Sequence, residues 1–425
     1  MDKLLLRGAR LLDPSSHMDE TGDLLICGDK IEHVGGTLHE TDARVINAAG
    51  MVAAPGLIDM HVHLRDPGFT EKEDVLSGCR AAAAGGVTSL LCMPNTRPAL
   101  DCAEAVSAVL QKAKQADARV YVAAAITKGL SGAQATNLRE LKEAGVVAIS
   151  DDGRPVENSA LMADAMHKAE QLGLFVTSHC EDLSLAAGGK LNEGKISNSL
   201  KVKGIPAAAE DCGTARELAL AQAYHLPVHI CHVSTKTSVA MIRDAKRRGV
   251  PVTCETAPHY FALTERELLR RDADYRMNPP LRTEEDRRAV IEGLQDGTID
   301  AIATDHAPHT PQEKADFLNA PCGVVGMETS LAAGITYLVE PGFLTLSKLI
   351  TLMSCNPARL LKIPGGTLAP GSPADIVLFN PAEHWTVNPA KLHGKSRNAV
   401  FKGRELVGRV KTTILGGKIV YHSEL

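Results

Sequence analysis

Short apolar runs and longer amphipathic stretches alternate regularly along the middle of the chain. Between about residues 55 and 363 there are eight such runs, and a stretch with helical character follows each of them. The runs are GLIDMHVHL, GVTSLLCMPN, ARVYVAAAI, GVVAISDDG, LFVTSHCED, LPVHICHVST, GVPVTCETAPH and TIDAIATDHAPH. Eight strand-then-helix units predict a (β/α)8 barrel of the TIM type. A doubly wound sheet is the alternative, but no GxGxxG sequence follows the first run.

Two of the expected helices have recognisable ends. Thr70 and Glu73 form a capping-box pattern before LSGCRAAAAGG, which stops at Gly85. Thr283 precedes EEDRRAVIEGLQDG in a similar way, and that stretch stops at Gly297. We therefore expect one helix to follow each of these two capping signals.

The two ends of the chain show short strands without intervening helices. Residues 1–54 contain KLLLRGARLL, DLLICGDKIEHVG and ARVINAAGMVAAPG, and residues 364–425 contain ADIVLFN and TTILGGKIVYH. Each end is too short to build a good core alone. We therefore predict one small β-sandwich made from both ends, in which each covers the apolar face of the other, beside a barrel of residues 55–363.

Composition and charge narrow the class of protein. The chain has 425 residues, of which 44% are hydrophobic and 23% charged, so it can bury a full-sized core. Its formal net charge is −5 and 3% of its residues are aromatic, which is unlike a nucleic-acid-binding protein. No stretch reaches the roughly 20 apolar residues that span a bilayer, and the N-terminus predicts no signal peptide. We expect neither a nucleic-acid nor a membrane partner.

The ten cysteines are scattered singly along the chain, with no CxxC pair. Several lie inside apolar runs such as SLLCM and HICHV, where a free thiol packs as a small core residue. This distribution predicts a reduced, cytoplasmic protein and argues against a disulfide-bonded scaffold.

Two histidines stand on one face of the first predicted barrel strand. Strand alternation places Ile58, Met60 and Val62 toward the helices, and His61 and His63 toward the barrel mouth. Two imidazoles at this spacing can hold one metal ion, although an isolated HxH is a weak signal.

Later runs end in the same kinds of side chain. SDDG closes the fourth run with Asp151 and Asp152, while His179, His232 and Asp305 close the fifth, sixth and eighth. Apolar strands usually end in small or apolar residues, so this joint placement favours a metal site at the barrel mouth. His179 and His232 would serve a second ion, and either aspartate of SDDG could bridge the pair. Zn²⁺ is the ion that such a nitrogen and oxygen donor set favours.

This arrangement is typical of hydrolases that use two metals. Two cations about 3.5–4 Å apart polarise a carbonyl group and lower the pKa of a water molecule. Asp305 could take the proton from the attacking water and pass it to a departing nitrogen.

Two further features depend on the strands and loops around this mouth. Strand parity turns His229 away from His232, so we expect His229 to pack against the helices. The segments MNPPLRTEED and 310–323 are long and rich in proline and polar residues, and each is a candidate to close over a substrate.

The chain resembles a known enzyme family through several motifs in combination. PGLIDMHVHLRDPG, MPNTRP, SDDG, SHCED, HVST, MNPPLR and DHAPH resemble the bacterial class I dihydroorotases of the amidohydrolase superfamily, over residues 4–420. The resemblance implies a metal-dependent barrel with a small sandwich domain. It also implies the reversible conversion of N-carbamoyl-L-aspartate to (S)-dihydroorotate in pyrimidine biosynthesis.

The resemblance further implies two Zn²⁺ ions per chain and a specific set of site residues. The implied metal ligands are His61, His63, Asp152, His179, His232 and Asp305. Many superfamily members bridge the metals with a carboxylated lysine, but VVAISDDGRP has none, and the spacing in the class I branch favours Asp152 over Asp151. The implied substrate contacts are His63, Arg65, Asn95, Asn278, His309, Cys322 and Gly323. The planar guanidinium of Arg65 suits the substrate carboxylate.

Two alternative functions stay open. An allantoinase or hydantoinase has the same barrel and metals, although HLRDPG with MPNTRP resembles the dihydroorotases more closely. A non-catalytic dihydroorotase-like subunit that scaffolds aspartate transcarbamoylase would have lost metal ligands, whereas this chain keeps all of them. The resemblance implies a homo-oligomer, a dimer, and is compatible with an active enzyme that associates with aspartate transcarbamoylase.

Overall fold

Eight parallel strands form the barrel in the computed structural model, which describes residues 3–40 and 42–423. The barrel strands are β6 (Leu57–Val62), β7 (Val87–Cys92), β8 (Arg119–Ala124), β9 (Ala148–Ile149), β10 (Phe175–Ser178), β13 (Val228–Ile230), β14 (Val252–Thr256) and β15 (Ala301–Ile302). They pair in chain order, and a parallel bridge between Val62 and His306 brings the last strand back to the first. Each strand lies within one of the eight apolar runs, so the predicted barrel is confirmed.

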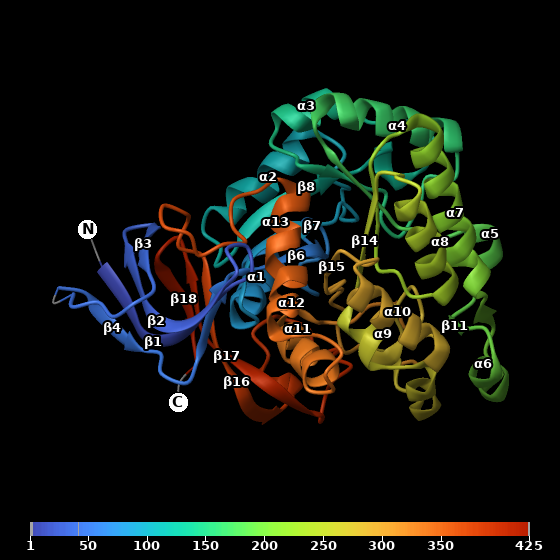
Figure 1. Cartoon of the computed structure of the whole chain (residues 1–425). Helices are drawn as coiled ribbons and strands as arrows, with labels where there is room; N and C mark the ends of the chain where they lie inside the picture. Colours follow the sequence, from blue (N-terminus) through green and yellow to red (C-terminus); the bar gives the residue numbers. More distant parts are fainter. Residues whose placement is uncertain (1–2, 41, 424–425) are drawn as a thin grey trace.

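Helices follow the barrel strands and cover their outer faces (Figure 1). The longer ones are α1 (Val75–Ala84), α2 (Ala103–Ala113), α3 (Leu138–Glu143), α4 (Ser159–Leu172), α7 (Ala207–Tyr224), α8 (Lys236–Arg247) and α10 (Glu284–Asp296). Short elements within the loops are α5 (Leu183–Ala186), β11 (Leu191–Asn192), α6 (Lys195–Leu200), β12 (Gly204–Ile205) and α9 (Pro258–Ala262). After β15 come α11 (Ser330–Gly334), α12 (Leu346–Ile350) and α13 (Asn356–Leu361). Among the described residues, no helix is long and apolar enough to cross a membrane.

Helix α10 has the predicted ends. The Thr283 side chain accepts a hydrogen bond from the backbone nitrogen of Asp286 at 3.3 Å, which completes a capping box. The helix stops at Gly297, whose φ of 82° lies in the left-handed region that glycine adopts without strain.

Helix α1 begins later than the predicted capping signal. Its cap is Asp74, whose carboxylate accepts a hydrogen bond from the backbone nitrogen of Ser77 at 2.8 Å. Glu73 is fully buried and accepts from the backbone nitrogen of Lys395 at 3.1 Å. A buried carboxylate requires hydrogen-bond donors. Because Glu73 finds its donor in this distant part of the chain, it does not form the capping box that Thr70 and Glu73 predicted for the helix N-terminus.

The barrel interior below the mouth is apolar. One cluster contains Ile58, Met60, Leu91, Met93, Ala123, Ala148, Ala301, Ala303, Ala358 and Leu361. The prediction that Ile58 and Met60 face the helices is therefore wrong. The pairing of β6 with β7 shifts register between Asp59 and Val62, and this irregularity breaks the simple alternation. As a result Val62 packs with the helix-facing core, while His61 still points into the barrel.

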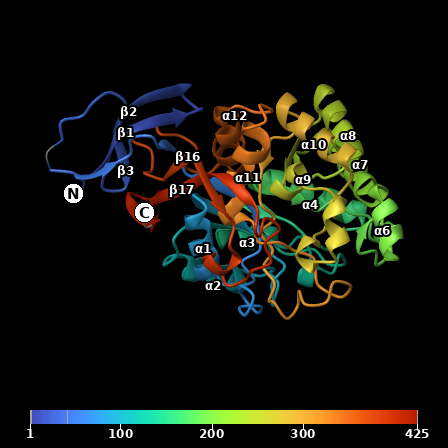
Figure 2. The same ribbon diagram turned by 90° about the horizontal axis from the view of Figure 1, so that it is seen from below.

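Strands from both chain ends form a second eight-stranded sheet beside the barrel, blue and red in Figure 1. They are β1 (Lys3–Asp13), β2 (Met18–Cys27), β3 (Lys30–Val34), β4 (Arg44–Asn47), β5 (Val52–Pro55), β16 (Ile376–Thr386), β17 (Glu405–Leu415) and β18 (Lys418–His422). The two ends join where β5 pairs antiparallel with β16. Figure 2 shows β1, β2 and β3 of the N-terminal end beside β16 and β17 of the C-terminal end. Leu6 and Leu24 share one buried core with Ile376 and Ile414. A small β-domain built from both ends is therefore confirmed. Its two parts join edge to edge in one sheet through β5 and β16, and not face to face as the predicted sandwich had them.

Candidate metal centre

The barrel mouth collects histidines and carboxylates from distant parts of the chain. His61 and His63 come from the end of β6, and His179, His232 and Asp305 follow β10, β13 and β15. None of these five residues exposes more than 6% of its surface. Polar groups buried to this degree need partners, and here they find them in one another.

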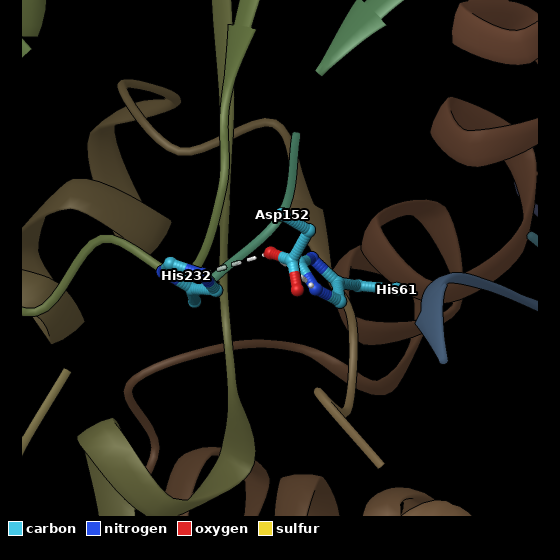
Figure 3. Close-up of side chains that lie close together, drawn as sticks. All are labelled: His61, Asp152 and His232. Carbon is cyan, nitrogen blue, oxygen red and sulfur yellow. Dashed lines mark ion pairs between the residues drawn. The ribbon is translucent and has the colours of Figure 1, made fainter. Parts of the chain in front are cut away.

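Asp152 lies among the four histidines, and Figure 3 shows it between His61 and His232. Its Oδ1 atom is 3.2 Å from His61 Nε2, 3.7 Å from His179 Nδ1 and 3.8 Å from His232 Nε2. Its Oδ2 atom is 3.6 Å from His63 Nε2. A carboxylate that faces four imidazoles through both oxygens could share cations with them.

The neighbouring Asp151 turns away from this cluster. Its Oδ1 atom accepts hydrogen bonds from the backbone nitrogens of Ile126 at 2.7 Å and Thr127 at 3.0 Å, and the Thr127 hydroxyl donates to Oδ2. These bonds fasten the loop after β8 to the end of β9. Of the two aspartates in SDDG, Asp152 is the one that reaches the histidines.

The backbone after two of the strands is bent so that the side chains return to the mouth. Asp305 has a φ of 49° and His232 a φ of 35°, in a region that residues other than glycine seldom adopt. Asp305 Oδ1 thereby lies 3.0 Å from His63 Nε2 and 3.7 Å from His61 Nε2. Such conformations cost energy and concentrate at functional sites.

Charge in the cluster keeps both aspartates ionised. Burial disfavours their charged forms, but the positive charge of the neighbouring imidazoles, and for Asp305 the hydrogen bond with His63, outweigh burial. The pKa of Asp152 and the pKa of Asp305 therefore both lie below the usual range for a carboxyl group. Both groups are carboxylates at neutral pH, the form that binds cations.

Two glutamates, the buried Glu255 and the partly buried Glu181, accept hydrogen bonds from two of the histidines, and the sequence pattern singled out neither of them. His61 Nδ1 is 3.0 Å from Glu255 Oε1, and His179 Nε2 is 3.0 Å from Glu181 Oε2. A carboxylate that accepts one ring N–H leaves the other ring nitrogen free to act as a ligand. The available signal for Glu255 was a charged residue inside the apolar run VPVTCET, since such residues are almost never buried unpaired.

His229 lies inside the barrel, so the prediction that it packs against the helices is wrong. Its Nε2 atom is 3.4 Å from Glu255 Oε2, its Nδ1 atom is 2.8 Å from Thr253 Oγ1, and its ring centroid is 5.1 Å from that of Phe175. Strand parity failed because His232 lies beyond the end of β13, where a positive φ has already turned the chain.

The cluster forms the floor of a cavity of about 250 Å³. The cavity is lined by His63, Arg65, Asn95, Asp152, Gly153, His179, His232, Asn278, Asp305, Ala307, His309, Cys322 and Gly323. Every residue predicted for the site lines it except His61, which lies beneath and has no exposed surface. The structure thus brings all the predicted site residues together.

Arg65 and His309 form one side of this cavity. Arg65 Nε donates to the carbonyl oxygen of Pro308 at 3.2 Å, and Arg65 Nη2 lies 3.3 Å from His309 Nε2. Burial lowers the pKa of Arg65 to about 10, so the guanidinium is charged at neutral pH. Burial and the nearby Arg65 charge lower the pKa of His309 to about 3. The neutral imidazole donates from Nε2 to the carbonyl oxygen of Cys322 at 2.9 Å.

Gly323 and Asn95 also line the wall of this cavity. A Cβ atom at Gly323 would lie 2.6 Å from the carbonyl oxygen of Ala307 and 2.9 Å from His309 Cδ2, so a side chain there would displace the imidazole. Asn95 Oδ1 lies 2.8 Å from His63 Nδ1, and Asn95 Nδ2 donates to Asp152 Oδ2 at 3.1 Å. The predicted substrate contact Asn95 therefore also orients two residues of the cluster.

The donor set fits divalent metal ions. Ligand atoms of His61, Asp152 and His232 lie within 4.8 Å of one another, as do those of His61, His63 and Asp305. Within the part of the chain that the structure describes, His61 Nε2 and Asp152 Oδ1 are buried without a hydrogen bond, as expected of groups that share a cation. Imidazole nitrogen and carboxylate oxygen are ordinary ligands of Zn²⁺ and similar ions. These residues can hold a metal ion.

Proteins of similar sequence and structure define the family. The chain belongs to the amidohydrolase family, whose model matches residues 52–420. Among curated relatives, the dihydroorotase of Geobacter metallireducens is 51% identical over 421 residues, 98% of this chain and 99% of the relative. The dihydroorotase of Syntrophus aciditrophicus is 47% identical over 427 residues, 99% of this chain and all of the relative. Within its family the chain therefore groups with the bacterial dihydroorotases.

Solved structures with the same fold include hydantoinases. The L-hydantoinase of Arthrobacter aurescens has a TM-score of 0.88 at 24% identity, covering 100% of this chain and 97% of that protein. A D-hydantoinase from Bacillus sp. AR9 has a TM-score of 0.86 at 27% identity, covering 99% and 95%. The fold is thus that of amidohydrolase barrels with a β-domain.

Proposed function

We propose that this chain is a dihydroorotase, a cyclic amide hydrolase that interconverts (S)-dihydroorotate and N-carbamoyl-L-aspartate in pyrimidine biosynthesis. One observation carries the proposal: three histidines, two aspartates and Arg65 line one cavity of about 250 Å³, and His61 lies beside Asp152 beneath it. Dihydroorotase relatives about half identical over nearly the whole chain support the same activity.

We assign two Zn²⁺ ions to the cluster. His61 and His63 would hold one ion, His179 and His232 the other, with Asp152 between them and Asp305 beside the first. Such ions polarise the amide carbonyl and lower the pKa of a water molecule.

The carboxylate of Asp305 is assigned to proton transfer. It takes the proton of the attacking water and gives it to the ring nitrogen as the C–N bond breaks. The water oxygen becomes the second oxygen of the new carboxyl group, which ionises at neutral pH. Ring opening therefore consumes one water and releases its second proton to the solvent. The lowered pKa of Asp305 keeps the group ionised and able to accept that proton at neutral pH.

Arg65 is assigned to the substrate carboxylate. Its guanidinium lines the cavity and is charged at neutral pH, and its planar N–H groups match a carboxylate through two parallel hydrogen bonds. Hydantoin and allantoin carry no carboxylate, so this contact favours dihydroorotate over the substrates of hydantoinases. Neutral His309, held by the Cys322 carbonyl, narrows the same side of the cavity.

The test is a substrate panel on the purified chain after reconstitution with zinc. Loss of absorbance from the dihydroorotate ring is followed in parallel with turnover of hydantoin and allantoin, and zinc is counted on the same preparation. We expect turnover of dihydroorotate and two zinc ions per chain. Turnover of hydantoin or allantoin without turnover of dihydroorotate would reject the assignment.

We also propose a cytoplasmic homodimer. All ten cysteines lie among the described residues and are free thiols, which supports a reducing compartment. The dimer, and an association with aspartate transcarbamoylase, come from the resemblance. Light scattering on the chain alone and mixed with that enzyme tests both.

A further inference from the structure

Glu181 joins two parts of the site that come from different segments of the chain. It follows His179 in the loop after β10, and its side chain is 9% exposed. Its Oε2 atom accepts one hydrogen bond from His179 Nε2 at 3.0 Å and another from Asn278 Nδ2 at 3.0 Å. One carboxylate oxygen therefore contacts both a residue of the metal cluster and a residue of the cavity wall.

The contact with His179 selects one form of its ring. A neutral imidazole carries one proton, and donation from Nε2 to Glu181 leaves Nδ1 as the lone-pair nitrogen. That atom faces the cluster, 2.9 Å from His232 Nε2 and 3.7 Å from Asp152 Oδ1. Glu181 thus holds His179 in the tautomer and orientation in which it can bind a cation.

The contact with Asn278 selects one orientation of its amide. The amide has an NH₂ end that donates and a carbonyl end that accepts. Because Nδ2 is engaged by Glu181, the Oδ1 atom of Asn278, a residue that lines the cavity, is left to accept a hydrogen bond. An acceptor at this place matches an N–H group of the ring of a cyclic amide.

We propose that Glu181 is a positioning residue that couples cation binding to substrate binding. Its charge orients the ligand His179, and the same oxygen orients the substrate contact Asn278. The inference deepens the proposed function and rests on it, because it takes the substrate to be a cyclic amide with a ring N–H. Glu255 supports His61 in a comparable way, but its other oxygen faces His229, which does not line the cavity.

The experiment compares zinc affinity and KM in the zinc-loaded full chain. We expect Glu181→Ala to weaken zinc binding by about 10–100-fold, measured by competition with a chromogenic chelator in the absence of substrate. Asn278→Ala is the matched variant and should keep the zinc affinity of the wild type. At saturating zinc, each variant should raise KM for dihydroorotate about tenfold, the loss expected for one buried hydrogen bond.

A double variant tests whether the two residues act together. If Glu181 acts on substrate through Asn278, the Glu181→Ala, Asn278→Ala chain has the KM of Asn278→Ala alone. Multiplied KM effects would overturn the proposal, and so would unchanged zinc affinity in Glu181→Ala.

Glu181→Gln separates the effect of the charge on His179 from the effect of the hydrogen bond on Asn278. It also keeps the test valid if the alanine variant does not fold. Its carbonyl oxygen can accept both hydrogen bonds, but it carries no charge. We expect zinc affinity between those of the wild type and Glu181→Ala, with KM close to the wild type. Zinc affinity equal to the wild type, or a KM as high as that of Asn278→Ala, contradicts the proposal. Absence of dihydroorotate turnover in the wild type contradicts the proposed function instead, while the chelator measurement still tests Glu181 against His179.

Discussion

The mouth of the barrel and the packed interior below it are built from the same eight strands, but they differ in chemistry. Met60 belongs to the apolar cluster with Leu91, Ala123 and Ala301, whereas His61, the next residue, is in contact with Asp152. Below the mouth most side chains are small or apolar, and the buried His229 and Glu255 pair with each other there. At the mouth the side chains are imidazoles and carboxylates. Two adjacent residues of one strand therefore serve two different purposes.

Because of this difference, we expect the mouth mainly to determine activity and the packed interior mainly to determine stability. Burying an apolar side chain stabilises the fold by about 1.5–3 kcal/mol, whereas burying charges costs stability unless they are paired. We therefore expect substitutions at the mouth to lower activity while the fold persists. Substitutions in the interior should lower stability while the folded fraction stays active.

The largest effect is expected at the mouth, for Asp305→Ala. Loss of the proposed proton carrier should lower kcat by about 100–10,000-fold, whereas metal content should stay largely intact because the five other proposed ligands are unchanged. Steady-state kinetics and metal analysis on one preparation check both parts. Asp151→Asn, which changes a carboxylate outside the cavity, is the control and should keep most of kcat. Normal turnover in Asp305→Ala would remove that residue from the mechanism.

Arg65→Lys should act at the mouth through substrate binding. A lysine keeps the charge but lacks the planar pair of N–H donors, so KM for dihydroorotate should rise about tenfold or more, with a smaller change in kcat. Arg97→Lys on the nearby loop, outside the cavity lining, should leave KM unchanged. Equal KM values for Arg65→Lys and the wild type would argue against a bidentate grip on the substrate carboxylate.

Leu91→Ala tests the packed interior. Leu91 is fully buried in the apolar cluster, so its truncation should lower the free energy of unfolding by about 2–5 kcal/mol. Below the unfolding transition, kcat and KM should stay close to those of the wild type. Urea denaturation and kinetics measure the two quantities. Leu269→Ala, at a leucine that is 51% exposed, should change stability by less than about 0.5 kcal/mol. A large loss of kcat in folded Leu91→Ala would contradict the expectation that the interior affects stability and not activity.

The smallest effect concerns the pH dependence of stability. The pKa of His309 is about 3 in the folded chain and about 6.5 when unfolded, so between these values the unfolded chain binds a proton that the native chain does not. The stabilisation is complete above about pH 6.5 and declines as the pH falls. His309→Asn removes this titration, so from pH 6.5 to 5 it should lose about 1–2 kcal/mol less than the wild type.

Urea denaturation across this pH range measures the difference between the two slopes. His384→Asn, at an exposed histidine of the β-domain, is the control and should follow the wild-type slope. Identical slopes for His309→Asn and the wild type would show that His309 is not held neutral.

The barrel could be predicted from the sequence because eight apolar runs end in turns. The residues of the cluster could be predicted because each predicted ligand stands at the end of one of these runs. The sequence did not predict that the Met60 side chain points into the barrel, because its direction depends on a register shift within β6. The position of His229 depends on a positive φ at His232, which a strand pattern does not reveal. Glu181 and Glu255 needed the structure because their partners are brought together by the closed barrel.

The pairing of β5 with β16 also has a consequence for biosynthesis. The N-terminal strands leave the ribosome with an unpaired edge, because Ile376, which pairs with Pro55, is translated only after the whole barrel. At about 5–20 residues per second this wait lasts on the order of 15–60 s. Throughout that time the β5 edge that later pairs with β16 stays unpaired, and an unpaired strand edge is a template for pairing with other chains.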